Sequence, residues 1–240
     1  LIDNILLGGG ITASNHTFLG ASAQIGWFNS QNTSLDLDSG IILSTGNVFS
    51  VDPLNIGPGL IMPSPIIYDT NLVTVANSVA PIIGQNFTVD TISDVAILEF
   101  DFIPTSDSIS FRYVFGSEEY FAWENTEYND VFAFFLSGPG INGPYANGAI
   151  NLATVPNSSP ELPITISSVN NGNNGAFPPI NDQYFVDNSL SLDTIASADG
   201  LTTIFTAKAL VQCNETYHIR LAIADGTDNL LDSYVWLEAG

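Results

Sequence analysis

Basic residues are very scarce in this chain. Only Lys208, Arg112 and Arg220 oppose 25 acidic residues across 240 positions, so the formal net charge is −22. Nucleic-acid-binding proteins neutralise phosphates with clustered lysine and arginine, and anionic membranes attract the same residues. The composition therefore argues against nucleic acid and anionic membrane surfaces as partners. Repulsion among so many acids destabilises a compact fold unless salt or bound cations offset it.

Cysteine and histidine are almost absent. The single Cys213 rules out an internal disulfide framework and a CxxC zinc site, and we expect it to pack as a small hydrophobe. His16 and His218 belong to no HExxH or nucleophile motif, which argues against catalysis that depends on histidine. Stabilisation must then come from packing, to which a bound metal could add.

Long apolar runs are missing as well. No stretch approaches the roughly 18 to 20 residues that span a bilayer, so we expect no membrane insertion by this domain. The segment Leu1–Leu7 lacks the basic region and cleavage pattern of a signal peptide. We therefore expect the chain to be part of a larger protein, with any secretion signal or anchor outside this sequence. High acidity, low lysine content and abundant Asn, Thr and Ser suggest an extracellular or cell-surface location.

Short apolar or alternating runs, separated by Gly, Pro, Asn and Asp, make up the sequence, and no 3.6-residue apolar period is sustained. This pattern predicts a single all-β domain over residues 1–240, a β-sandwich of jelly-roll type with long loops. The predicted strands are Gly40–Ser44, Val95–Phe102, Ser108–Phe115, Val131–Leu136, Ile164–Val169, Thr202–Ala209, Tyr217–Ala224 and Tyr234–Glu238.

Some segments carry more specific expectations. Val131–Leu136 is apolar at every position, as in a central strand that is covered on both faces. The Pro/Gly-rich stretch Asp52–Pro65 and the Asn/Gly-rich stretch Asn170–Asp182 are predicted surface loops. The one helix that the spacing allows lies around Asp69–Ala80.

Carboxylates are concentrated where predicted strands end. Glu118 and Glu119 follow one strand, Asp130 opens the next, and an acidic loop containing Glu124 and Glu127 joins them. Calcium takes six to eight oxygen ligands from carboxylates, carbonyls and amides, so this unit is chemically suited to it. The alternative is a set of ordinary solvated loop acids.

A second acidic connection lies near the C-terminus. Asp225, Asp228 and Asp232 stand between two predicted strands, and Gly226 permits a tight turn that would converge their oxygens. The spacing is not that of an EF-hand, and an Asx-rich hairpin loop is the competing interpretation. The predicted metal ligands are Glu118, Glu119, Asp130, Asp225, Asp228 and Asp232, with calcium as the cofactor.

Two further acid pairs, Asp36/Asp38 and Glu99/Asp101, are spaced by two residues. In a strand each pair would project from one face, where mutual repulsion calls for a cation or an arginine partner. We interpret them chiefly as surface or salt-bridge residues, with Arg112 or Arg220 as the candidate partner.

Several aromatic residues fall outside the alternating pattern and could stack on a sugar or a peptide. Trp123 and Tyr128 lie in the acidic loop and are the candidate ligand-binding residues. Paired acids also raise the alternative of a glycan-binding or carbohydrate-active domain with acids in a cleft. Glu118 and Glu119 are adjacent, however, and point in opposite directions along an extended backbone. A structural spacer without a ligand is the remaining alternative.

Four ordered motifs resemble the choice-of-anchor L domain of bacterial proteins. They are Gly40–Gly46 (GIILSTG), Phe111–Tyr120 (FRYVFGSEEY), Asn129–Gly140 (NDVFAFFLSGPG) and Ile223–Gly240 (IADGTDNLLDSYVWLEAG). The resemblance spans essentially the whole chain.

The resemblance implies a module of large secreted or surface proteins, common in Bacteroidota and joined to differing C-terminal anchoring segments. Many such proteins look like adhesins or gliding-motility proteins exported by the type IX secretion route. The resemblance to this family implies no catalytic residues. The predicted function is therefore a non-catalytic, calcium-stabilised adhesin or ligand-binding module whose partner is a surface ligand, glycan or peptide.

Overall fold

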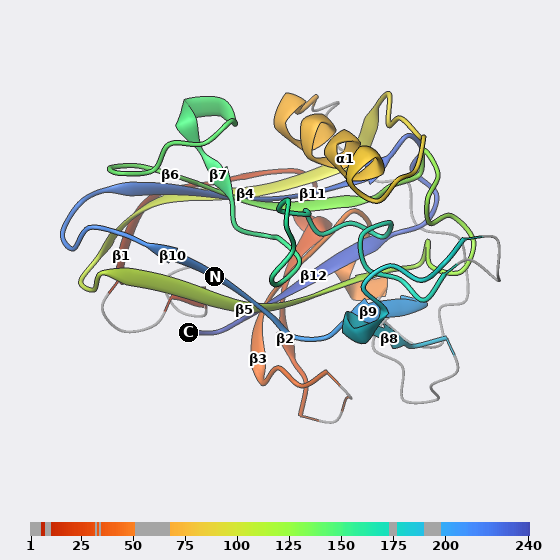
Figure 1. Cartoon of the computed structure of the whole chain (residues 1–240). Coiled ribbons are helices and arrows are strands. Elements are labelled where there is room, and N and C mark those ends of the chain that lie inside the picture. Colours follow the sequence, from red (N-terminus) through yellow and green to blue (C-terminus); the bar gives the residue numbers. More distant parts are fainter. Residues whose placement is uncertain are drawn as a thin grey trace.

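The chain folds into two stacked antiparallel β-sheets (Figure 1). The computed structural model describes residues 6–7, 11–31, 33, 35–50, 68–172, 177–189 and 198–240. The first sheet has five strands, in the order β1 (Ile11–Leu19), β4 (Ile92–Pro104), β11 (Tyr217–Gly226), β6 (Val131–Ser137) and β7 (Ile150–Asn151).

The second sheet has seven strands. Six of them follow the order β2 (Ile25–Asn29), β3 (Ser39–Ser44), β12 (Ser233–Glu238), β5 (Ser108–Ser117), β9 (Gly200–Thr202) and β8 (Phe185–Asp187). The seventh, β10 (Phe205–Leu210), pairs with β5 beside β9. Strands β4, β5 and β6, and again β10, β11 and β12, alternate between the sheets, as in a jelly roll. The predicted β-sandwich is confirmed.

Strand β6 lies at the centre of the packing. Phe132 and Phe134 face the other sheet in the main aromatic core, where Tyr113 of β5 contacts both rings at centroid distances of 5.6 and 5.2 Å. The alternate residues, including Ala133 and Phe135, belong to a second apolar cluster on the outer face of the sheet. The prediction that this strand is covered on both sides is confirmed.

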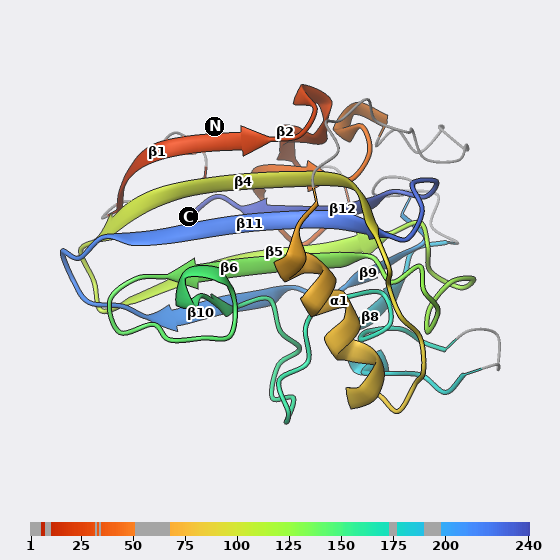
Figure 2. The ribbon, with the colours of Figure 1, turned by 90° about the horizontal axis from the view of Figure 1, so that it is seen from above.

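Helix α1 (Thr70–Ile82) provides the outer cover (Figure 2). It begins after Asp69, whose Oδ1 accepts a hydrogen bond from the backbone N–H of Leu72 at 2.9 Å, as an N-cap residue does. Leu72, Val75 and Ala76 pack on the second cluster. The helix predicted around Asp69–Ala80 is confirmed. The described residues also form the single-turn 3-10 helices η2 (Ser22–Gln24), η3 (Val48–Ser50), η4 (Ala146–Gly148) and η5 (Asp182–Tyr184).

The predicted strand Ile164–Val169 is wrong. The segment is fully buried but forms a turn, in which Ser168 N–H donates to the Thr165 carbonyl at 3.2 Å and the Ser168 hydroxyl donates to the same oxygen at 3.0 Å. Its apolar run reflects burial against the main core rather than strand pairing. The predicted strand Thr202–Ala209 is divided between β9 and β10.

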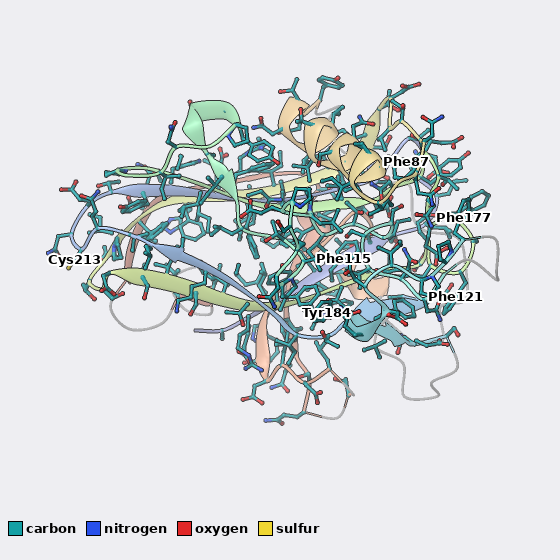
Figure 3. The ribbon with its side chains drawn as sticks, viewed as in Figure 1. Phe87, Phe115, Phe121, Phe177, Tyr184 and Cys213 are labelled. Carbon is teal, nitrogen blue, oxygen red and sulfur yellow. The ribbon has the colours of Figure 1, made fainter. Side chains whose placement is uncertain are left out.

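Three further expectations concern Cys213 and two predicted loops. Cys213 is exposed, contrary to the expectation that it packs as a small hydrophobe, because it lies in the turn between β10 and β11. Figure 3 shows it at the opposite end of the sandwich from Phe121. The predicted loop Asp52–Pro65 lies outside the described residues. The described parts of Asn170–Asp182 are irregular, with Asn170 bridging to Ile180.

Candidate metal centre and ligand surface

Three acidic segments meet at one end of the sandwich because of strand pairing. β11 pairs with β6 in one sheet, and β12 pairs with β5 in the other. The end of β5, the start of β6 and the β11–β12 connection therefore lie together. All six acids predicted as metal ligands belong to these segments, which we call the acid end: residues 117–130 and 225–233.

Asp130 joins the two sheets. Its Oδ1 accepts a hydrogen bond from the Gly226 N–H of β11 at 2.9 Å, and its Oδ2 accepts one from the Ser233 hydroxyl of β12 at 2.6 Å. Burial raises the pKa of Asp130 to about 7, although these two hydrogen bonds act in the opposite direction. Asp228 and Glu118 raise it further by repulsion.

Glu118 makes a similar connection within the second sheet. Its Oε1 accepts from the Tyr234 hydroxyl at 3.0 Å and its Oε2 from the Asp232 N–H at 3.2 Å. The Glu118 N–H in turn donates to the Asp232 carbonyl at 3.0 Å. Both carboxylate oxygens are thus used to hold β12 against β5, which gives Glu118 a structural task.

Asp225 has the fewest hydrogen bonds of the acids in this group. It is 1% exposed, and neither carboxylate oxygen has a well-formed hydrogen bond among the described residues. Burial raises the pKa of Asp225 well above its usual value, repulsion from Asp130 adds to this, and the nearby Thr45 hydroxyl offsets part of it. An ionised carboxylate in this position requires a compensating charge.

A β-bulge places Asp225 inside. The pairing of β11 with β4 shifts by one residue between Ile223 and Asp225, and Asp94 on β4 has a φ of 46°. Such a bulge bends the strand and redirects its side chains. Gln24 fixes the bulge, because its amide donates to the Asp94 and Thr45 carbonyls, each at 2.7 Å.

Gly46 makes room for Asp232. A Cβ atom at residue 46 would lie 1.8 Å from the Asp232 Oδ2, so the backbone of the GIILSTG motif directly covers this carboxylate. We expect Gly46→Ala to lower the free energy of unfolding by about 2 kcal/mol or more through overpacking, as measured by urea denaturation.

A double-mutant cycle tests this cause. Asp232→Ala removes the clashing oxygens, so Gly46→Ala should cost at least about 1 kcal/mol less in that background than in the native one. Equal costs in both backgrounds would show that the close approach to Asp232 is not the reason Gly46 is required.

Glu119 and Glu124 form the other half of the acid end. Both are buried, and each has one carboxylate oxygen without a hydrogen-bond partner among the described residues. Burial raises the pKa of Glu119 to about 10, with repulsion from Asp130, Asp228, Glu118 and Glu124 contributing. Burial also raises the pKa of Glu124, although its Oε1 accepts from the Phe121 N–H at 2.6 Å.

Further polar atoms near Glu124 lack partners among the described residues: the hydroxyl of Tyr120 and both side-chain amide atoms of Asn125. Buried polar groups are nearly always satisfied by protein, water or an ion. The sequence analysis missed Asn125 and Tyr120 as site residues. Only their nearness in sequence to the acidic residues could have indicated them, because the burial of this loop depends on contacts with segments distant in sequence.

Asp228 differs from the other five predicted ligands because it is only half-buried. Burial raises its pKa, and the Leu230 N–H approaches its Oδ1 at 3.4 Å. Within the described part of the chain, no three Asp, Glu, His or Cys side chains form a ready-made metal-binding group. A cation at the acid end would therefore need backbone, amide, hydroxyl or water oxygens beside one or two carboxylates, a mixture that calcium accepts.

The two candidate ligand-binding aromatics lie together. Trp123 and Tyr128 meet edge to face with ring centroids 4.9 Å apart, and Trp123 is 41% exposed. The backbone N–H of Trp123 donates to the backbone carbonyl of Glu119 at 3.1 Å, which ties the segment that carries this aromatic pair to the buried acids. An exposed aromatic face beside a rigid loop can stack on a ligand.

The remaining acid pairs lie elsewhere. Glu99 and Asp101 on β4 contact Arg220 and His218 of β11, at 3.4 Å from Glu99 Oε2 to Arg220 Nε and 2.8 Å from Asp101 Oδ1 to His218 Nδ1. This agrees with their interpretation as salt-bridge residues. Asp36 and Asp38 are exposed beside buried leucines in the loop before β3.

The fold and the site together define the chain as an all-β sandwich whose acidic loops gather at one end. The chain belongs to the choice-of-anchor L domain family, whose profile matches residues 1–240. Membership marks a secreted or surface-associated module, and the family is not known as enzymatic. No curated protein and no solved structure matches the chain. None of the described helices is long and apolar enough to cross a membrane.

Proposed function

We propose that this domain is a non-catalytic ligand-binding module of an adhesin-type surface protein, and that calcium bound at the acid end stabilises it. The single observation that carries the calcium assignment is the buried carboxylate of Asp225 beside Asp130 and Asp232, for which the described residues provide no well-formed hydrogen bond. A charge in such a place must be neutralised by a proton or by a cation. Calcium fits because the polar side chains of the acid end offer oxygen ligands.

The direction of the pKa shifts supports the same proposal. The pKa values of four carboxyl groups at the acid end are raised, so ionising these groups in the folded protein costs free energy. They are Glu119, Glu124, Asp130 and Asp225. A divalent cation removes that cost by pairing with the ionised forms. Only three basic side chains exist in the chain, and Arg112 and Arg220 already pair with acids elsewhere. The arginine side chains are therefore not available to neutralise the buried carboxylates of the acid end, and a bound metal ion is the better candidate.

The binding assignment rests on the aromatic pair Trp123–Tyr128. The pair lies on the loop that contains Glu119 and Glu124, so an ion at the acid end would hold the loop in one conformation. Preordering a loop in this way reduces the entropic cost of binding. The ligand is a glycan or peptide on another surface, and calcium strengthens its binding without contacting it.

The aromatic pair provides a test of ligand binding. We expect Trp123→Ala with Tyr128→Ala to weaken retention of the whole chain on a printed glycan and peptide array at least about tenfold, because stacking faces are lost. Trp27→Ala is the matched control, since Trp27 is 55% exposed on β2. Retention that is unchanged in the double variant, or no saturable retention with calcium present, would leave a spacer domain as the better account.

A further inference from the structure

A polar pocket lies on the outer face of the five-stranded sheet, away from the acid end. Its volume is about 320 Å³, and residues at the N-terminus of α1, on β4, β6 and β11, and around the η4 turn line it. Figure 2 shows α1 lying over β6, and the helix also contacts β11. The floor includes Arg220, Phe135 and Glu99. None of the lining residues belongs to the acid end.

Arg220 is fixed at the base of this pocket. Its Nη2 pairs with Asp69, its Nε lies 3.4 Å from the Oε2 of Glu99, and its guanidinium carbon lies 5.9 Å from the centroid of the Phe135 ring. Two carboxylates and an aromatic face therefore hold one cation in a defined orientation. The helix start is tied to the sheet by the same contacts.

The carboxylates around Arg220 are largely occupied. Asp69 accepts from the Leu72 N–H at 2.9 Å as well as from Arg220, and the Oε1 of Glu99 accepts from the Thr17 hydroxyl at 3.0 Å. Two donors at the pocket have no hydrogen-bond partner among the described residues: the Nη1 of Arg220 and the side-chain NH₂ of Asn71. The Ser137 hydroxyl also lines the pocket and can both donate and accept. The Nε2 of His218 lies 3.8 Å from the Oε2 of Glu99.

These free groups determine the chemistry of the ligand. Donors call for acceptor oxygens, so an ammonium ligand fits poorly. An anion is also disfavoured, because Asp69, Glu99 and the adjoining Asp101 outnumber Arg220 and the chain carries a net charge of −22. The matching ligand is neutral and rich in hydroxyl or amide oxygens. Tyr68, 62% exposed at the pocket, supplies an aromatic ring.

We infer that this pocket binds a single unit of a neutral saccharide, a hexose or N-acetylhexosamine. A volume of about 320 Å³ accommodates one such unit, at the small end of the range for ligand pockets. The site is independent of the proposed calcium centre. Its ligand can belong to a chain that also contacts the aromatic pair at the acid end, or to a separate molecule.

Ligand-observed NMR on the whole chain tests the inference with glucose, galactose and N-acetylglucosamine as neutral probes, glucuronate as the anion and glucosamine as the cation. We expect saturable binding of at least one neutral sugar, with a Kd on the order of millimolar. Thr70→Trp places a large side chain at the exposed pocket edge without touching the Asp69 cap, and Arg220→Gln removes the fixed donor. Each should weaken binding at least about tenfold.

The control is Arg112→Gln, which removes a cation from the other sheet and should leave sugar binding unchanged. Thermal unfolding establishes that each variant is folded, and Thr70→Trp keeps the test decisive if Arg220→Gln does not fold. Binding that survives Thr70→Trp, stronger binding of glucuronate or glucosamine, or no neutral-sugar binding would overturn the inference. Repeating the titration in chelator separates it from the calcium proposal, because the pocket contains none of the proposed calcium ligands.

Discussion

Calcium should raise the thermal unfolding midpoint of this domain by about 3 to 10 °C at pH 8, on going from chelator to about 10 mM calcium. The estimate takes a Kd of about 0.1 to 1 mM, which is typical of extracellular calcium modules. Binding to the folded state alone then contributes about 1.4 to 2.7 kcal/mol. Differential scanning calorimetry, with sodium chloride added to equal ionic strength, separates site binding from screening of the −22 net charge.

Charge-matched variants sharpen this prediction. Glu119→Gln with Asp225→Asn removes two buried acids and should abolish most of the calcium-dependent shift, while the chelated protein becomes more stable because the cost of two buried charges is gone. Asp36→Asn with Asp38→Asn removes two exposed acids and should retain the shift. An equal loss of the shift in both double variants would point to general counterion effects instead.

Without calcium, stability should fall by at least about 2 kcal/mol as the pH rises from 5 to 8, measured by urea denaturation in chelator. The responsible groups have pKa values raised by burial, to about 7 for Asp130, about 6 for Asp199 and about 10 for Glu119. Between the unfolded and folded pKa values the native state binds more protons than the unfolded state. Raising the pH through this window therefore destabilises the fold.

Calcium should flatten this pH dependence, because the cation stabilises the ionised carboxylates in the folded state. Asp101 acts in the opposite sense: hydrogen bonds from Asn15 and His218 lower its pKa, so its contribution is lost only as the pH falls below the usual carboxyl range. The window from pH 5 to 8 thus isolates the acid end and Asp199. A stability that stays constant or increases with pH in chelator would contradict the burial of ionisable carboxylates described above.

Much of the sandwich could be predicted from periodicity. The run Val131–Leu136 shows burial on both faces, and the alternation in Tyr217–Ala224 shows one face toward the core. The sequence analysis missed β1 because Asn15 and His16 interrupt its apolar alternation, and its burial pattern is mostly exposed. It misassigned Ile164–Val169 because an apolar run records burial but not backbone pairing.

The candidate site was predictable only in part, for a similar reason. The positions of the acids at strand ends predict that they gather at one end once the strands pair. They do not distinguish Asp225, which is fully enclosed, from Asp228, which is half-exposed. That difference arises from the bulge at Asp94, which depends on the pairing of two strands that are distant in sequence.

The central claim is that calcium neutralises the buried acids, and a high-resolution crystal structure grown in millimolar calcium tests it most directly. The account predicts an anomalous-scattering peak at the acid end, 2.3 to 2.6 Å from an oxygen of at least one of Asp225, Asp130 and Glu119, with carbonyl or water oxygens completing six to eight ligands. An acid end that holds only water, with these carboxyls hydrogen-bonded to one another or to solvent, would contradict it.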